Sequence, residues 1–167
     1  MKLDDDIALA LRLADAAGAA IRPYFRAVEA ERKGDATPVT LADRAAEEAM
    51  RRILTAEVPR DAVIGEEFGA TTGSSGRSWV LDPIDGTTGF LAGRALFGTL
   101  IALVVEGFPV LGVIDQPISG ERWVGATGRP TTLNGKPVRT RACRSLADAT
   151  LATTGPRRMA ALPQVPT

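Results

Sequence analysis

The spacing of apolar residues predicts two helices at the start of the chain. Residues 4–27 carry apolar side chains at helical intervals, with acidic and basic residues between them. A second helix is expected from Thr40 to Pro59, with Thr40 as its N-cap and Asp43 at its third helical position. The apolar positions of the first helix are Ile7, Leu11, Ala14, Gly18, Ile21 and Phe25, and those of the second are Leu41, Ala45, Ala49 and Ile53.

From Val63 onward the pattern changes to short β-like runs separated by turn sequences. These runs are AVIG, SWVL, LFGTLIALVV, PVLGVIDQ and ERWVGA. A hairpin is expected with Glu106 and Gly107 in its bend, and Asn134-Gly135 predicts a second tight turn. The stretch GATTGSSGR is expected to form a mobile surface loop. Helices followed by strands predict an α+β fold with a mostly antiparallel sheet.

Length and charge narrow the class of protein. The 167 residues favour one domain, and Lys plus Arg and Asp plus Glu balance at 20 each. The sequence has no basic stripe of the kind that binds nucleic acid or an anionic membrane. Three acids near the amino terminus and the lack of a long apolar run predict a soluble, cytoplasmic protein.

The composition also restricts the chemistry. The chain has no histidine, which is the commonest general base and zinc ligand. Its single cysteine, Cys143, cannot form an internal disulfide and is expected to be an inert buried thiol. Any reaction would therefore depend on carboxylates, hydroxyls and the backbone.

Acidic residues gather where predicted strands give way to loops. Glu66 and Glu67 follow AVIG, Asp82 and Asp85 follow WVL, and Asp43 lies at the start of the second helix. Two carboxylates 4 Å apart repel by about 4 kcal/mol at an effective dielectric near 20, so a cation is expected to neutralise them. Oxygen ligands of this kind suit Mg²⁺.

The segment around Pro83 suggests how the ligands would be arranged. Because Pro83 has a fixed φ and no N–H group, a turn there would hold both aspartates and the Ile84 carbonyl on one side. The following Gly86-Thr87-Thr88-Gly89 would offer backbone amides to a phosphate if a short helix begins there. Taken singly, each residue is more often structural, but together they indicate phosphoester chemistry.

A family resemblance rests on these same segments. GEE at residues 65–67 and WVLDPIDGTTGF at residues 79–90 resemble the paired signatures of the inositol monophosphatase family. KGDATPVTLADRAAE and LFGTLIALVVEGFPVLGVIDQPISGERWVGA are similar to its neighbouring segments, so the resemblance covers most of residues 5–154. Within the family, LFGTLIAL, GVIDQP and TRACRSLADATLATT resemble the histidinol-phosphate phosphatase-like branch most.

The resemblance implies a metal site. Glu66, Asp82 and the Ile84 carbonyl would bind one Mg²⁺ ion, and Asp82 and Asp85 would contribute to a second. Glu67 would lie beside these ligands without binding the metal.

The resemblance also implies catalytic and substrate-binding residues. Glu66 would hold the metal that carries the attacking water, and Thr87 with Asp43 would orient this water. The Gly86 and Thr87 amides would bind the phosphate beside Asp85. Lys33 would lie on a loop near the site.

The end of the chain departs from the family pattern. The family is an alternating α-β sandwich of two linked halves, and a WD segment in the second half completes the second metal site. This sequence has no such segment: residues 1–154 would form the amino-terminal domain and residues 155–167 an irregular tail. A truncated or frame-shifted gene product, a deliberately shortened chain and a true half-length protein remain alternatives. A weaker second metal site, poor or absent turnover and an exposed apolar sheet face that promotes association are expected.

Two functions from different classes follow. The first is a magnesium-dependent phosphomonoesterase acting on a small alcohol phosphate such as histidinol phosphate or inositol monophosphate. Nucleotide-bisphosphate and sugar-bisphosphate phosphatases are alternatives within that class. The second is a non-catalytic truncated remnant that retains one metal site and acts through association. A homodimer is expected by analogy with relatives.

Overall fold

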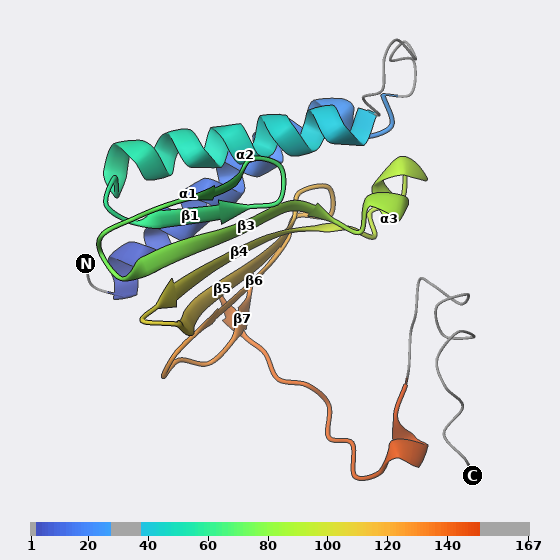
Figure 1. The fold of residues 1–167 in the computed structure, drawn as a ribbon. Helices are drawn as coiled ribbons and strands as arrows, with labels where there is room; N and C mark the ends of the chain where they lie inside the picture. Colours follow the sequence, from blue (N-terminus) through green and yellow to red (C-terminus); the bar gives the residue numbers. More distant parts are fainter. Residues whose placement is uncertain (1–2, 28–37, 151–167) are drawn as a thin grey trace, which may run out of the picture.

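Two long helices lie along one side of a twisted sheet in the computed structural model, which describes residues 3–27 and 38–150 (Figure 1). This arrangement confirms the α+β fold. The helical elements are α1 (Leu3–Ile21), the 3₁₀ turn η1 (Arg22–Tyr24), α2 (Pro38–Glu57), α3 (Thr87–Leu91) and η2 (Leu146–Asp148). The strands are β1 (Ala62–Gly65), β2 (Gly69–Thr71), β3 (Arg77–Asp85), β4 (Gly98–Val105), β5 (Phe108–Gln116), β6 (Glu121–Ala126), β7 (Thr132–Leu133) and β8 (Lys136–Pro137).

The eight strands form one sheet in the order β2-β1-β3-β4-β5-β6-β7-β8. Among the described strands only β1 and β3 pair in parallel, so the expected mostly antiparallel sheet is confirmed. Both predicted turns are also present. Glu106 and Gly107 join β4 to β5 with φ of 49° and 83°, and Asn134 and Gly135 join β7 to β8 with φ of 48° and 77°. Positive φ at both central residues matches the twist of the two strands.

The helices cover one face of the sheet and leave the other open. Trp79, Leu81 and Leu103 point to the helices and are buried. On the opposite face, Ile64 and Ile114 remain 45% and 50% exposed. The exposed apolar face that we expected is therefore present among the described residues, whereas association through it remains a prediction.

The first helix is shorter than its apolar pattern predicts. It ends at Ile21 instead of continuing to residue 27, and the chain goes on as the 3₁₀ turn η1. Pro23 explains the difference, because proline lacks an N–H group and its ring clashes with the carbonyl four residues earlier.

The second helix differs from the prediction in its start and in its buried face. It begins at Pro38, so Thr40 lies inside it and is not the N-cap. Proline is well tolerated at the first helical position. The fully buried apolar positions are Ala42, Ala46, Met50 and Leu54, whereas Leu41 is 47% exposed. Ala42 and Ala46 are small, so α2 can pack closely against its neighbours. The buried stripe of α2 therefore lies one residue later in the sequence than predicted, and Leu41 of the predicted stripe is left partly exposed.

Two further predictions were wrong. Residues 69–71 of GATTGSSGR form β2, which pairs with β1, so this part is a strand and not a loop. Cys143 is exposed, because the segment that follows β8 does not pack on the core. Lys33 and the predicted tail of residues 155–167 lie outside the described residues. None of the described helices is both long and apolar enough to cross a membrane.

Candidate functional site

A β-bulge places Asp82 and Asp85 on the same face of the sheet. The two aspartates pair with residues of β4 that are only two positions apart, so β3 has one extra residue here. The burial pattern agrees: Pro83 and Ile84 are consecutive buried residues, whereas Asp82 is half-buried and Asp85 is exposed. Side chains normally alternate between faces, and the extra residue brings both carboxylates to the same face of β3.

Two threonines hold the backbone of this bulge. The buried Thr99 hydroxyl on β4 donates to the Pro83 carbonyl oxygen at 2.8 Å. The Thr87 hydroxyl donates to the Ile84 carbonyl oxygen at 3.4 Å. Among the described residues no hydrogen bond joins Thr87 to Asp43, and their joint orientation of a water remains a prediction.

Parallel pairing of β1 with β3 brings Glu66 to Asp82. The Glu66 N–H donates to the Leu81 carbonyl at 3.3 Å, which continues the ladder one residue beyond β1. Asp43 approaches the same place from α2 and is 6% exposed. Three segments far apart in the sequence therefore bring their acidic residues together.

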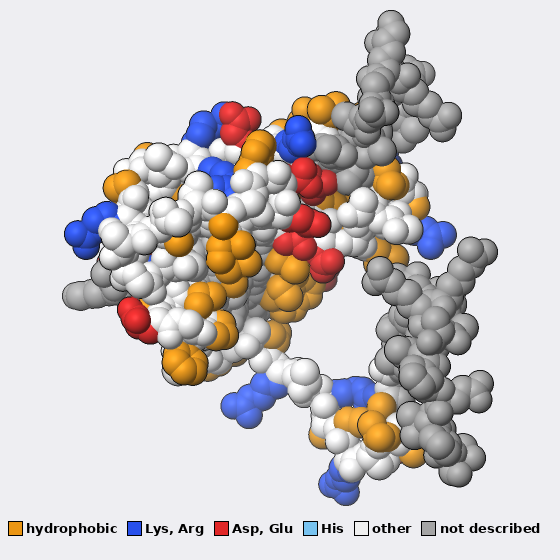
Figure 2. All heavy atoms as spheres, viewed as in Figure 1, with side chains coloured by type: hydrophobic (Ala, Val, Ile, Leu, Met, Phe, Trp, Pro, Cys, Tyr) orange, Lys and Arg blue, Asp and Glu red, His pale blue; other side chains and the backbone are white. Residues whose placement is uncertain are grey.

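The crowding changes the acidity of two of these residues. Burial, followed by the charges of Glu67, Glu66, Asp82 and Glu47, raises the pKa of Asp43 to about 7. Burial and contact with Glu66, followed by the charge of Asp85, raise the pKa of Asp82 to about 7. Figure 2 shows acidic side chains gathered beside an apolar surface, in the region where β3 runs into α3. Such an environment favours either protonation or a bound cation.

The residues present fit a magnesium ion. Asp82 Oδ1 is buried and has no hydrogen-bond partner. Within residues 3–27 and 38–150, no three acidic, histidine or cysteine side chains form a group able to hold a metal ion by themselves. Mg²⁺ does not require such a group, because it keeps several waters and is usually bound through one or two carboxylates. Glu66, Asp82 and the Ile84 carbonyl would supply this partial set, with Asp85 at its exposed side.

The short helix α3 begins directly after the bulge, as the phosphate-binding prediction requires. Its N-cap is Gly86 with φ of 96°, where a Cβ atom would lie 2.7 Å from the Leu96 carbonyl oxygen. Phe90 anchors the helix, and its ring centre lies 5.1 Å from that of Phe97 in an edge-to-face arrangement. The first amides of a helix lack intrahelical acceptors, so those of Gly86 and Thr87 suit an anion.

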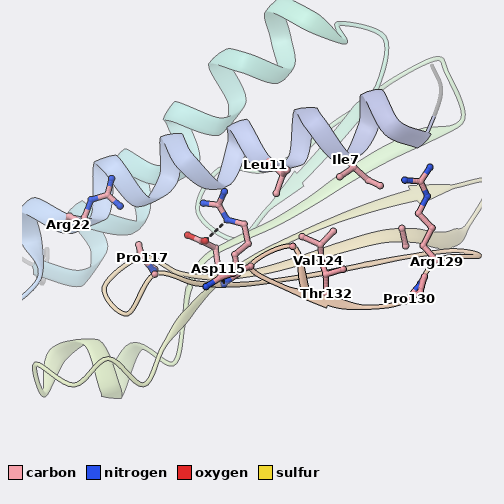
Figure 3. A pocket seen from close by; sticks show the side chains of 14 residues that line it. Ile7, Leu11, Arg22, Asp115, Pro117, Val124, Arg129, Pro130 and Thr132 are labelled. Carbon is pink, nitrogen blue, oxygen red and sulfur yellow. Dashed lines mark hydrogen bonds and ion pairs between the residues drawn. The ribbon is translucent and has the colours of Figure 1, made fainter. Parts of the chain in front are cut away.

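A cavity of about 580 Å³ lies elsewhere, between α1 and the strands β5 to β7 (Figure 3). Its lining includes Ile7, Leu11 and Val124 and none of the acidic residues described above. The cavity also contains charged side chains, among which Arg122 Nε donates to Asp115 at 2.6 Å. We assign the candidate site to the carboxylates, because their crowding raises the pKa of Asp43 and of Asp82, and because the buried Asp82 Oδ1 has no partner.

Comparison with known proteins identifies the group to which this arrangement belongs. The family model of the inositol monophosphatase family matches residues 2–165. The chain belongs to the inositol monophosphatase family. It is 50% identical over 158 residues to the bifunctional phosphatase IMPL2, chloroplastic, of Arabidopsis thaliana, covering 93% of this chain and 46% of that protein. It is 46% identical over 127 residues to the histidinol-phosphatase of Mycobacterium tuberculosis, covering 75% and 49%.

Solved structures of this family confirm the fold. An inositol monophosphatase from Zymomonas mobilis superposes with a TM-score of 0.76 at 55% identity, covering 86% of this chain and 55% of that one. The extragenic suppressor protein suhB from Bartonella henselae gives a TM-score of 0.75 at 28% identity, covering 84% and 56%. The chain thus spans about half the length of the relatives that it matches.

Sequence reasoning missed one acidic residue beside this candidate site. Glu47 is completely buried on α2 and contacts the loop that carries Glu66 and Glu67. No local signal distinguishes it, because Glu47 with Arg51 and Glu48 with Arg52 form identical i,i+4 pairs in the sequence.

Proposed function

We propose that the protein is a magnesium-dependent phosphomonoesterase that acts on a small alcohol phosphate. The observation that carries this proposal is the group of crowded carboxylates around Asp82, whose buried Oδ1 atom has no partner, in a member of a phosphatase family.

The proposed roles follow the bulge and the start of α3. Glu66, Asp82 and the Ile84 carbonyl would hold one Mg²⁺ ion, and Asp85 would contribute to a second. Bound Mg²⁺ supplies an acidified water and neutralises charge on the phosphate. We assign the orientation of the attacking water to Asp43 and Thr87, which requires Thr87 to turn from the Ile84 carbonyl. The amides of Gly86 and Thr87 would donate to the phosphate oxygens.

For the substrate we propose histidinol phosphate or inositol monophosphate. Proteins named histidinol-phosphatase are 46% and 48% identical to this chain, and the inositol monophosphatase from Zymomonas mobilis is 55% identical.

The test is phosphate release by the purified protein from both substrates, with Mg²⁺ or with a chelator. We expect release that requires Mg²⁺ and that falls at least about 100-fold in Asp85→Asn, since even residues beside metal ligands cost 10- to 100-fold. Asp85 is exposed, so this variant should fold. Asp4→Asn is the matched control, because Asp4 is an exposed carboxylate that pairs with Arg129.

Other results would point elsewhere. Release that is unaffected by the chelator would refute metal-dependent hydrolysis. Magnesium binding without turnover on either substrate would favour the non-catalytic alternative.

We also propose that two copies of the chain associate through the open face of the sheet. Support comes from Ile64, Val80 and Ile114, which are exposed on the side of the sheet that faces away from both long helices. Contiguous apolar surfaces of this kind commonly mark sites of association.

A further inference from the structure

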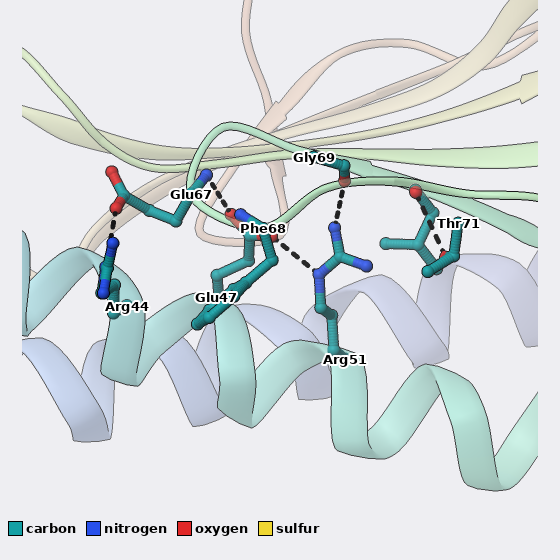
Figure 4. Close-up of polar contacts among 8 residues, drawn as sticks. Arg44, Glu47, Arg51, Glu67, Phe68, Gly69 and Thr71 are labelled. Atoms are coloured by element: carbon teal, nitrogen blue, oxygen red, sulfur yellow. Dashed lines mark hydrogen bonds and ion pairs between the residues drawn. The ribbon is translucent and has the colours of Figure 1, made fainter.

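The carboxylate of Glu47 lies at 0% exposure beneath the loop that follows β1 (Figure 4). Its Oε2 atom accepts a hydrogen bond from the Glu67 backbone N–H at 2.8 Å. Its Oε1 atom accepts a second from the Phe68 backbone N–H at 3.2 Å. An ionised side chain is costly to bury unless its oxygens have partners, and here the partners are backbone atoms of one short loop.

Arg51, one turn further along α2, completes this connection. Its Nε atom donates to Glu47 Oε1 at 2.7 Å, and its Nη2 atom donates to the Gly69 carbonyl. The two side chains of α2 therefore bind three consecutive residues, Glu67 and Phe68 of the loop and Gly69 at the start of β2, through two N–H groups and one carbonyl.

Gly65 makes room for the buried carboxylate. A Cβ atom at this position would overlap the Glu47 carboxylate, with Oε1 as its nearest neighbour. The φ of Gly65 is not positive, so the reason for glycine is close approach and not backbone conformation. The glycine of the sequence GEE thus leaves space for the Glu47 carboxylate directly before the two glutamates of the loop.

Glu66 lies between two anchors. Its own N–H is bound to Leu81 of β3, next to Asp82, and the N–H of the following residue is bound to Glu47. We propose that Glu47, held by Arg51, is a positioning residue that sets Glu66 against Asp82 for a divalent cation. This inference rests on the proposed metal site, and Glu47 itself is not a ligand, because its two oxygens are occupied by donors from the protein.

The test compares two variants that remove the same charge from neighbouring residues of α2. Glu47→Gln keeps the volume of the side chain but offers an N–H group where an acceptor is needed. Glu48→Gln is the matched control, since Glu48 is exposed and its partner Arg52 lies at 3.4 Å. Two quantities are measured on folded protein: hydrogen exchange of the Glu67 and Phe68 amides without metal, and the Kd for Mg²⁺ by calorimetry.

We expect Glu47→Gln to speed exchange of both amides at least tenfold and to raise the Kd for Mg²⁺ at least tenfold. Glu48→Gln should change neither. A folded Glu47→Gln protein that binds Mg²⁺ as the wild type does would overturn the inference, because a merely stabilising residue would alter unfolding without altering metal affinity.

Two further outcomes are also decisive. If Glu47→Gln does not fold, Arg51→Gln takes its place, since it keeps the Glu47 carboxylate but removes the bonds of Arg51 to Glu47 and to Gly69. A smaller rise in Kd supports the inference, and an unchanged Kd overturns it. If the wild type binds no Mg²⁺, the proposed function and the metal part of this inference both fail, while the exchange data still decide whether Glu47 holds the loop.

Discussion

The Asp61 carboxylate accepts hydrogen bonds from three side chains near the start of the sheet. Its replacement by alanine should therefore lower the free energy of unfolding. Asp61 accepts hydrogen bonds from Ser75 at 2.7 Å, Trp79 at 3.1 Å and Arg77 at 3.2 Å. In Asp61→Ala the indole N–H of Trp79, which is fully buried, loses its acceptor at a cost of about 1–3 kcal/mol. Arg77 contributes less to the loss, because in the variant it keeps its ion pair with Asp6 at 2.5 Å. We expect a total loss of about 3 kcal/mol, which lowers the Tm by about 6–12 °C in a chain of this length.

The loss should also depend on pH. Burial raises the pKa of Asp61, but hydrogen bonds from Ser75, Trp79 and Arg77 and the charge of Arg77 outweigh it, so the pKa lies below its ordinary value. An acid with a depressed folded-state pKa stabilises the fold above its unfolded pKa of about 3.9. This stabilisation is lost as the pH falls through the folded-state pKa. The difference between wild type and Asp61→Ala should therefore be largest near neutral pH and should shrink below about pH 4.

The assay is urea unfolding at a series of pH values, followed by the fluorescence of the tryptophans. Asp15→Ala is the control, since its carboxylate is 69% exposed and its bond to Arg122 should contribute about 0.2–1 kcal/mol. A loss in Asp61→Ala no larger than in this control, or one that does not change between neutral and acidic pH, would refute the reasoning.

Three other predictions concern the site and the open face. Gly86→Ala should lower the free energy of unfolding by at least about 2 kcal/mol, because its Cβ atom clashes with Leu96 and because alanine is strained at positive φ. Gly107→Ala, with φ of 83° and no atom within 4 Å, should lower it by only about 1 kcal/mol. Equal losses in the two variants would show that the clash with Leu96 has no effect. Thr99→Val should lower the free energy of unfolding by about 1 kcal/mol and weaken Mg²⁺ binding, because the bulge loses the hydrogen bond to the Pro83 carbonyl. An unchanged Kd for Mg²⁺ in calorimetry would show that this bond does not position the ligands. Ile114→Ser with Val80→Ser should reduce self-association in sedimentation experiments, and a wild type that stays monomeric at high concentration would disprove dimerisation through this face.

The features that were predictable from sequence are those with local causes. The hairpin at Glu106-Gly107 and the turn at Asn134-Gly135 depend on a few residues that tolerate positive φ. The apolar, β-like runs located β1 and β3 to β6 but not β2, β7 or β8, and the run WVLDPIDGTTGF with GEE pointed to the acidic group and to the family. Among the described residues, Glu66 and Asp85 lie close enough to Asp82 for their charges to raise its pKa.

Other features depend on contacts between distant parts of the chain, and only the tertiary structure decided them. The predicted stripe of α2 was displaced because Ala42 and Ala46 pack closely against other elements. The bulge that puts Asp82 and Asp85 on one face is defined by the register of β3 against β4. Glu47 resembles Glu48 in every local respect, yet one is buried and the other exposed. Burial is a property of the whole packing arrangement, so the sequence alone determined which residues carry charge, and the fold decided which of those charges face one another.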